Sequence, residues 1–469
     1  MLTQSRILLS RVTWRQFWNG PGGGGEVLAV AYPLVLSHVS YTVQTFADRL
    51  FLTWYSPEAM AGAVAGLFTV YGVVGLFQAT GEYLTTFVAQ YHGAGKPERI
   101  GAAVWQGIYL ALAAGLVIAL LSPLNRLLFS AAGHGAALVE NEVLFSGILL
   151  RGSAATILMV TLASFFSGRG ETRTVLVVNV VSCVVNVVLA WVLIFGKAGF
   201  PALGVAGAAW AVVLAQVLGC ILYLALIFSG SHRVRYALGN WRPEPRLLLR
   251  ILRYGLPAGL QYSLELFSFA LFLLIVGRLG TVELAATGIA FNLNALVFIP
   301  IMGLALGVSA VVGRHLGAGN PEAAERSTWS GFGLSLAFML VCCALYLFAP
   351  GALVAPYAAG ADPTAFAHVG ELARVLLRFV AFYSIFDMMN LVFSGGLKGA
   401  GDTRYPMTVT IVLVIFVMLV PAYVLCVPLG RGIFTAWACV TAYAALGGPL
   451  MLRRFRRGAW KSLRVIEGR

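Results

Sequence analysis

The chain has 469 residues, of which 59% are hydrophobic and only 11% are charged, and its formal net charge is +14. A soluble domain averages about 25% charged residues, so this composition excludes an ordinary soluble protein. Apolar runs near the roughly 20 residues needed to cross a bilayer recur from end to end. These runs lack the alternation of a transmembrane β-barrel. The composition therefore predicts an all-α polytopic membrane protein.

The predicted elements begin after residues 1–26, a basic segment that ends in a flexible glycine-rich joint and does not resemble a cleavable signal peptide. A basic tail at 453–469 ends the chain. Between them we expect 12 transmembrane helices, at 27–54, 61–91, 101–123, 143–166, 174–196, 204–229, 247–277, 284–313, 328–349, 370–395, 406–427 and 432–452.

The charge pattern indicates how the chain crosses the membrane. Most Lys and Arg residues in the predicted loops fall on one side, which places both termini in the cytoplasm and favours the plasma (inner) membrane. The positive charge then reflects topology and contact with the lipid bilayer, so no nucleic-acid partner is expected. The six cysteines lie in apolar runs without a CxxC motif, which argues against disulfides and metal sites.

The chain contains an internal duplication. Pro33 in the first half corresponds to Pro257 in the second, and the same spacing, here called the repeat spacing, aligns the GAG tripeptides at 93–95 and 317–319. Later in each half, a slightly longer spacing aligns Gly170 with Gly401. Six spans in each half give two repeats of the same orientation, related by an axis along the membrane normal.

The duplication predicts two lobes, an N-lobe at 27–229 and a C-lobe at 247–452, joined by a cytoplasmic linker at 230–246. Two matching six-helix lobes suit alternating access.

Six motifs occur in order over about residues 25–452: FADRLFLTW, VAQYHGAGKPERI, VVNVVLAWVLIFG, LPAGLQYSLELFSFA, VGRHLGAGNPEAAERS and FSGGLKGAGDTRYPM. Together they resemble the family of multidrug and toxic compound extrusion (MATE) antiporters. The resemblance implies two parallel six-helix repeats that form a V-shaped pair of lobes and expel organic cations in exchange for H⁺ or Na⁺.

Four acids fall well inside the predicted spans: Asp48, Glu82, Glu265 and Asp387. An acid at the centre of a transmembrane helix costs about 2.5–3.5 kcal/mol, so such acids normally face a cavity and serve function. A carboxylate can hold a proton or a cation, and holding both costs energy, which provides a means of coupling.

Glu265 and Asp387 lie near mid-depth of their spans and resemble the family's seventh-span Glu and tenth-span Asp. Asn390 follows Asp387 on the same helical face. The sequence therefore predicts a proton or Na⁺ site in the C-lobe, formed by Glu265 and Asp387.

Asp48 resembles the family's first-span Asp, and Gln44 and Tyr41 share its helical face. Its neighbour Arg49 points about 100° away, so a direct ion pair between them is not expected.

The fifth span departs from one branch of the family. Asn186 matches that branch's Asn, but Ala190 stands where the branch has a second Asp. Asn179 and Asn186 share one face and can still bond Asp48. The missing acid favours coupling through the C-lobe acids.

The role of Glu82 is left open between a second substrate-binding acid and a partner for Arg49 or Arg151. His38 is interpreted as a bundle histidine rather than a proton relay.

These features predict a secondary active exporter of small organic cations, a multidrug efflux antiporter that acts as a monomer without an obligate protein partner. No Walker motif is present, and neither an enzymatic activity nor a cofactor is expected. The alternative is a lipid-linked oligosaccharide flippase of the same superfamily. That function calls for a basic cleft, whereas only Arg49, Arg151 and Arg378 lie in or near the spans. A channel or receptor would not need two facing lobes with buried acids.

Overall fold

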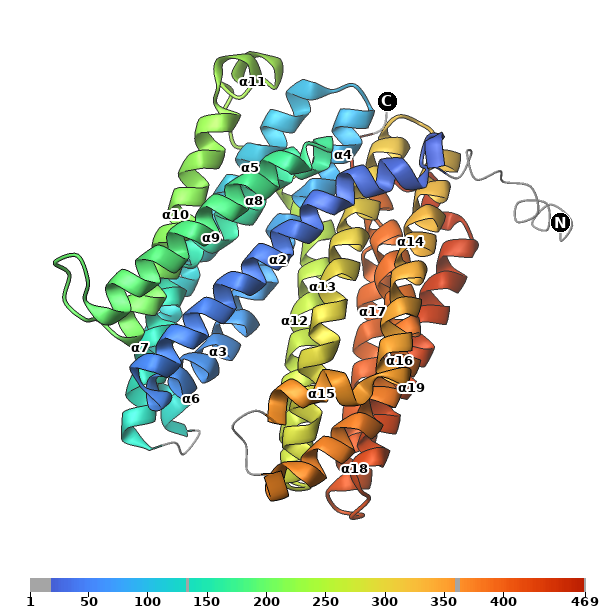
Figure 1. The fold of residues 1–469 in the computed structure, drawn as a ribbon. Helices are drawn as coiled ribbons and strands as arrows, with labels where there is room; N and C mark the ends of the chain where they lie inside the picture. Colours follow the sequence, from blue (N-terminus) through green and yellow to red (C-terminus); the bar gives the residue numbers. More distant parts are fainter. Residues whose placement is uncertain (1–17, 132–134, 359–362, 468–469) are drawn as a thin grey trace, which may run out of the picture. The chain divides into compact units, whose positions relative to one another are not determined.

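The computed structural model describes residues 18–131, 135–358 and 363–467, and these residues form helices and no strand (Figure 1). Residues 1–17 of the predicted basic segment and 468–469 of the tail lie outside them. By length and composition, eleven of the described helices can cross a membrane. A pair bent by 46°, α7 (Ala136–Arg151) and α8 (Ser153–Arg169), gives a twelfth. The predicted all-α fold is confirmed, with 11 or up to 12 candidate spans among the described residues.

The chain divides into two compact units. Unit 1 holds the described residues up to Val35 and Ser268–Arg464, and unit 2 holds Leu36–Phe267 and the described residues from Val465. Two long helices, α2 (Gly24–Tyr55) and α12 (Pro245–Gly277), are therefore each divided between the units.

The other helices each lie within one unit. Besides α7 and α8, unit 2 contains α3 (Pro57–Glu82), α4 (Leu84–Gly93), α5 (Pro97–Leu121), η1 (Ser122–Leu124), α6 (Asn125–Ala131), α9 (Thr172–Phe195), α10 (Val205–Ile227) and α11 (Gly230–Arg235). Unit 1 contains α13 (Thr281–Gly317), α14 (Pro321–Phe348), α15 (Pro350–Ala358), α16 (Pro363–Ala400), α17 (Arg404–Leu413), the π-helical η2 (Val414–Leu419), α18 (Val420–Cys426), α19 (Ile433–Arg456) and η3 (Ala459–Ser462).

Each unit has its own packing arrangement. In unit 1, α16 contacts α13, α14 and α19 (Figure 1). In unit 2, α3 packs on α7, α5 on α8, and α9 on α10. Fully buried aromatic side chains such as Trp437 in unit 1 and Phe165 in unit 2 lie in these interiors.

The backbone repeats the same turn at matching positions of the two halves. Gly95 and Gly319 both have positive φ, at 67° and 77°. The N–H of Lys96 donates to the carbonyl of Tyr91 at 3.0 Å, and that of Asn320 donates to His315 at 2.9 Å. Both bonds close the end of a helix around a left-handed glycine. The repeat spacing seen in the sequence is thus present in the backbone.

The compact units differ from the predicted lobes at the first helix of each repeat. In unit 1, a Cβ added to Gly307 would lie 2.7 Å from the Cβ of Ala31, so α2 and α13 approach closely. In unit 2, a Cβ added to Gly259 would lie 2.3 Å from the carbonyl of Leu76, so α12 and α3 approach closely. Small residues permit these contacts. The start of α2 therefore belongs with the carboxyl-terminal helices, and the start of α12 belongs with the amino-terminal helices.

Candidate functional site

Asp48 lies on the part of α2 that belongs to unit 2. Its side chain is half-buried, and its Oδ1 is a buried atom without a hydrogen-bond partner. Gln44, one turn earlier on the same face, is buried. Arg49 is exposed, and no ion pair between Asp48 and Arg49 is found in the described structure. A buried polar atom normally has a partner, so the unpartnered Oδ1 of Asp48 is an unusual feature of this helix.

The helix α9 packs against this part of α2. The thiol of Cys183 donates to the carbonyl of Ser40 at 3.2 Å. Further along both helices, the rings of Phe51 and Trp191 lie 5.3 Å apart. Between these two contacts, α9 carries Asn186, which is fully buried.

No hydrogen bond from Asn179 or Asn186 to Asp48 is found in the described structure. The Oδ1 of Asn179 accepts a bond from the hydroxyl of Tyr223 at 3.3 Å, and this bond orients its amide. Both polar atoms of Asn186 are buried without a partner. Ala190, where one branch of the family has an acid, is fully buried and supplies no polar group. Asp48 and Asn186 are thus unsatisfied groups on packed helices.

Glu265 lies on the part of α12 that belongs to unit 2. Its Oε1 accepts a bond from Nε2 of Gln261 at 3.0 Å. Tyr262 of the same helix interacts electrostatically with Glu265, with Glu82 of α3 and with Tyr41 of α2. Unit 2 therefore brings two of the predicted acids and one predicted polar residue around a single tyrosine.

A second tyrosine, Tyr71 of α3, extends this group. Its hydroxyl is hydrogen-bonded to that of Tyr41. Sequence reasoning misses both Tyr71 and Tyr262, because aromatic residues in spans are more often packing or lipid contacts. The available signal is helical spacing, since Tyr262 precedes Glu265 by about one turn.

Asp387 lies half-buried on α16 of unit 1. Tyr383, about one turn earlier, interacts with it electrostatically, and the Tyr383 hydroxyl is buried without a hydrogen-bond partner. Asn390, about one turn later, lines a small hollow, and its Oδ1 is also buried without a partner. Asp387 and Asn390 thus lie about one turn apart on α16.

Glu265 and Asp387 fall in different compact units. Their joint proton or Na⁺ site therefore stays a prediction. Among the described residues, no group of three or more His, Cys, Asp and Glu side chains is arranged to hold a metal ion.

The sequence pattern of the MatE family matches residues 33–192 and 257–424. The chain belongs to the MatE family. The two matched segments correspond to the two predicted repeats, and this MatE chain is accordingly a multi-pass membrane protein of a transporter family, not an enzyme.

Relatives of this MatE chain cover nearly its full length. It is 27% identical over 447 residues to a probable multidrug resistance protein NorM of Thermotoga maritima, covering 94% of each chain. It is 31% identical over 434 residues to a probable multidrug resistance protein NorM of Burkholderia pseudomallei, covering 92% of each chain.

Solved structures share the fold of this MatE chain. An outward-facing multidrug resistance MATE transporter matches 95% of this chain and 99% of its own, with a TM-score of 0.84 and 21% identity. A transporter of the wider superfamily from Pyrococcus furiosus, described as having a binding pocket of reversed polarity, matches with the same TM-score and identity over 96% of this chain and all of its own.

Proposed function

We propose that the protein is a multidrug efflux transporter of the plasma (inner) membrane that exchanges amphipathic organic cations for H⁺ or Na⁺ by alternating access of two lobes. Family membership and the NorM relatives support this function. The observation that carries the exchange mechanism is the buried, unpartnered Oδ1 of Asp48 in a helix long enough to span a membrane.

The mechanism follows from competition for carboxylates. A cation near a buried carboxylate stabilises its charged form, whereas protonation removes the attraction for the cation. The candidate acids are Asp48, Glu265, Asp387 and Glu82, with polar support from Gln44, Tyr41, Asn179, Asn186 and Asn390. Ions that load from outside displace the drug, and after the lobes reorient, loss of the ions inside allows new drug to bind. No cofactor, nucleic acid or protein partner takes part, and the transporter works as a monomer.

The experiment that tests this function is transport in proteoliposomes with imposed gradients. Uptake of ethidium, a flat aromatic cation, is followed with ΔpH and ΔNa⁺ applied separately. Transport driven by either gradient supports the antiporter and identifies its coupling ion. If neither gradient moves ethidium or another aromatic cation, while a fluorescent lipid-linked sugar is exchanged between leaflets, the flippase is the correct function.

A further inference from the structure

An ionic clasp joins the start of the first helix to the end of the eighth span in unit 1. Glu26, in the first turn of α2, forms an ion pair with Arg314 near the end of α13. Its Oε1 also lies 3.0 Å from Nε2 of His315. Its Oε2 accepts the N–H of Gly22 at 2.6 Å. One acid thus binds two neighbouring side chains just before a GAG turn.

The matching positions of unit 2 do not carry the same charges. At the repeat spacing, Arg250 takes the place of Glu26, and Gln90 and Tyr91 take the places of Arg314 and His315. These three positions thus hold a basic residue, an amide and a phenol. These three residues alone contain no acid, so this side cannot form the clasp of unit 1.

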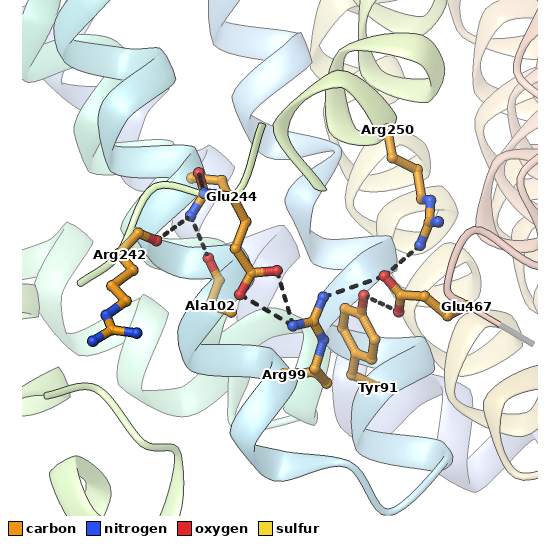
Figure 2. Close-up of polar contacts among 8 residues, drawn as sticks. Tyr91, Arg99, Ala102, Arg242, Glu244, Arg250 and Glu467 are labelled. Atoms are coloured by element: carbon orange, nitrogen blue, oxygen red, sulfur yellow. Dashed lines mark hydrogen bonds and ion pairs between the residues drawn. The ribbon is translucent and has the colours of Figure 1, made fainter. Parts of the chain in front are cut away.

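The carboxyl-terminal tail supplies the missing acid. Glu467 forms ion pairs with Arg250 at 2.5 Å and with Arg99 at 3.2 Å (Figure 2). The hydroxyl of Tyr91 donates to its Oε2 at 2.7 Å. Two residues earlier, the N–H of Val465 donates to Oε1 of Gln90 at 2.9 Å. The tail therefore binds all three positions that correspond to the clasp of unit 1, namely Arg250, Gln90 and Tyr91. We call this set of contacts the second clasp.

The linker between the repeats completes this second clasp. Arg99 also binds Glu244, with Nη1 at 2.9 Å from Oε2 (Figure 2). Two arginines thus face two carboxylates, and withdrawal of Glu467 leaves Arg250 without the ion pair. Val465 is 1% exposed, whereas the side chain of Glu467 is 37% exposed.

The same tail is anchored in unit 1 a few residues earlier. The ring of Trp460 stacks on Phe455 with centroids 4.7 Å apart, and its Nε1 donates to the carbonyl of Phe455 at 2.8 Å. Lys461 forms an ion pair with Glu325 of α14. The chain passes from unit 1 to unit 2 between Arg464 and Val465. The link of three or four residues between Lys461 and Val465 spans at most about 14 Å. If the contacts of these two residues move further apart than this, one of the contacts must break.

We propose that residues 465–467 form a releasable strap, in which Glu467 closes the second clasp in one state of the transport cycle and leaves it in another. This inference rests on the proposed alternating access. The Glu467 end is the one that releases, because partly exposed ion pairs are weak, whereas Trp460 is fully buried. Through the strap, Glu467 takes part in the switching mechanism on the predicted cytoplasmic side.

Hydrogen–deuterium exchange of the Val465 amide measures docking directly, because this N–H is bonded within the clasp. The full-length protein in proteoliposomes is compared with Glu467→Gln and with the control Glu98→Gln, which alters an exposed acid in the first turn of α5. We expect the amide to be protected in the wild type and in the control. Loss of the charged partner in Glu467→Gln should speed exchange by up to about fivefold, as expected for partly exposed ion pairs. Equal exchange in all three proteins would show that the charge of Glu467 does not hold the tail in place, and the strap would be wrong.

The same measurement during ethidium transport tests release. We expect Val465 of the wild type to exchange faster when an ion gradient and ethidium are both present than when either is absent. If ethidium is transported while Val465 stays as protected as at rest, the tail is a fixed structural element and the strap is wrong. If no gradient moves any cation, the proposed function fails, and the strap fails with it even where resting docking is observed.

Discussion

The thiol of Cys183 donates to the carbonyl of Ser40 at 3.2 Å and fixes α9 against the part of α2 that carries Asp48. This contact puts the unpartnered amide of Asn186, one turn after Cys183, on the helix that faces the acid. Two packed helices of one unit thus hold buried polar atoms for which the described protein offers no partner. Such groups are retained where a ligand, ion or water satisfies them.

Asp48→Asn is expected to uncouple transport without unfolding the protein. The amide keeps the size of the side chain but cannot exchange a proton or hold a cation. Ethidium transport should fall about 5- to 150-fold, the range of a typical coupling free energy. The thermal unfolding midpoint should not fall, because a neutral side chain removes the penalty of burying a charge.

The matched control for this substitution is Glu58→Gln, at an exposed position in the first turn of α3. It should leave transport unchanged. A protein with Asp48→Asn that transports at the rate of the control would show that Asp48 has no coupling role.

Glu265→Gln is expected to slow transport by a similar factor of about 5 to 150. The glutamine keeps an oxygen that accepts from Gln261, so the helix should remain folded while the charge is lost. Initial rates in proteoliposomes, with Glu322→Gln at an exposed position of α14 as the control, provide the measurement. Full-rate transport by Glu265→Gln contradicts its proposed role.

Gly307→Val is expected to destabilise unit 1. Its Cβ would lie 2.7 Å from the Cβ of Ala31, so the side chain has no room. Overpacking of this kind costs about 1–3 kcal/mol, and thermal unfolding in detergent measures it. Gly288→Ala on the same helix is the control, because nothing lies within 4 Å of its added Cβ. We expect this control to gain about 0.5–1 kcal/mol; equal melting of both variants contradicts the close contact of α2 and α13.

Docking of the tail is expected to depend on acid pH. Burial tends to raise the pKa of Glu467, but the bond from Tyr91 and the charges of Arg250 and Arg99 outweigh it and hold the pKa below its ordinary value of 4.5. A lowered folded-state pKa means that docking is complete above pH 4.5 and weakens as the pH falls through the lowered value. Protection of the Val465 amide, corrected for intrinsic exchange, should be constant at neutral pH and fall only below 4.5. Loss of protection between pH 6 and 8 is incompatible with this carboxylate as the controlling group.

Much of the fold follows from local sequence. Long apolar runs predict the spans, and the GAG tripeptides predict the paired turns, since Gly95 and Gly319 adopt positive φ that other residues rarely accept. The units are harder to predict. The boundaries of the units depend on which helix packs closely against Gly259 and which against Gly307. The sequence of one repeat does not indicate these partner helices.

The acids of the site can be predicted from the sequence, because an acid inside a membrane span is energetically costly. The hydrogen-bond partners of the polar residues are harder to predict. The hydroxyl of Tyr223 donates a hydrogen bond to the Oδ1 of Asn179. This contact between residues far apart in the sequence is not indicated by any spacing. By sequence alone, Glu467 is one acid in a basic tail. The repeat nevertheless indicates that Arg250 needs an acidic partner, because the repeat spacing aligns this arginine with Glu26, the acid of the other clasp.

The division of α2 and α12 between the units has a consequence for how the protein is built. Neither half of the gene product can complete a unit alone, because each half donates its first helical segment to the other half's helices. Two fragments produced by cutting the chain in the linker would each lack a packing element and would be complete only when synthesised together. Each repeat therefore contributes residues to both compact units.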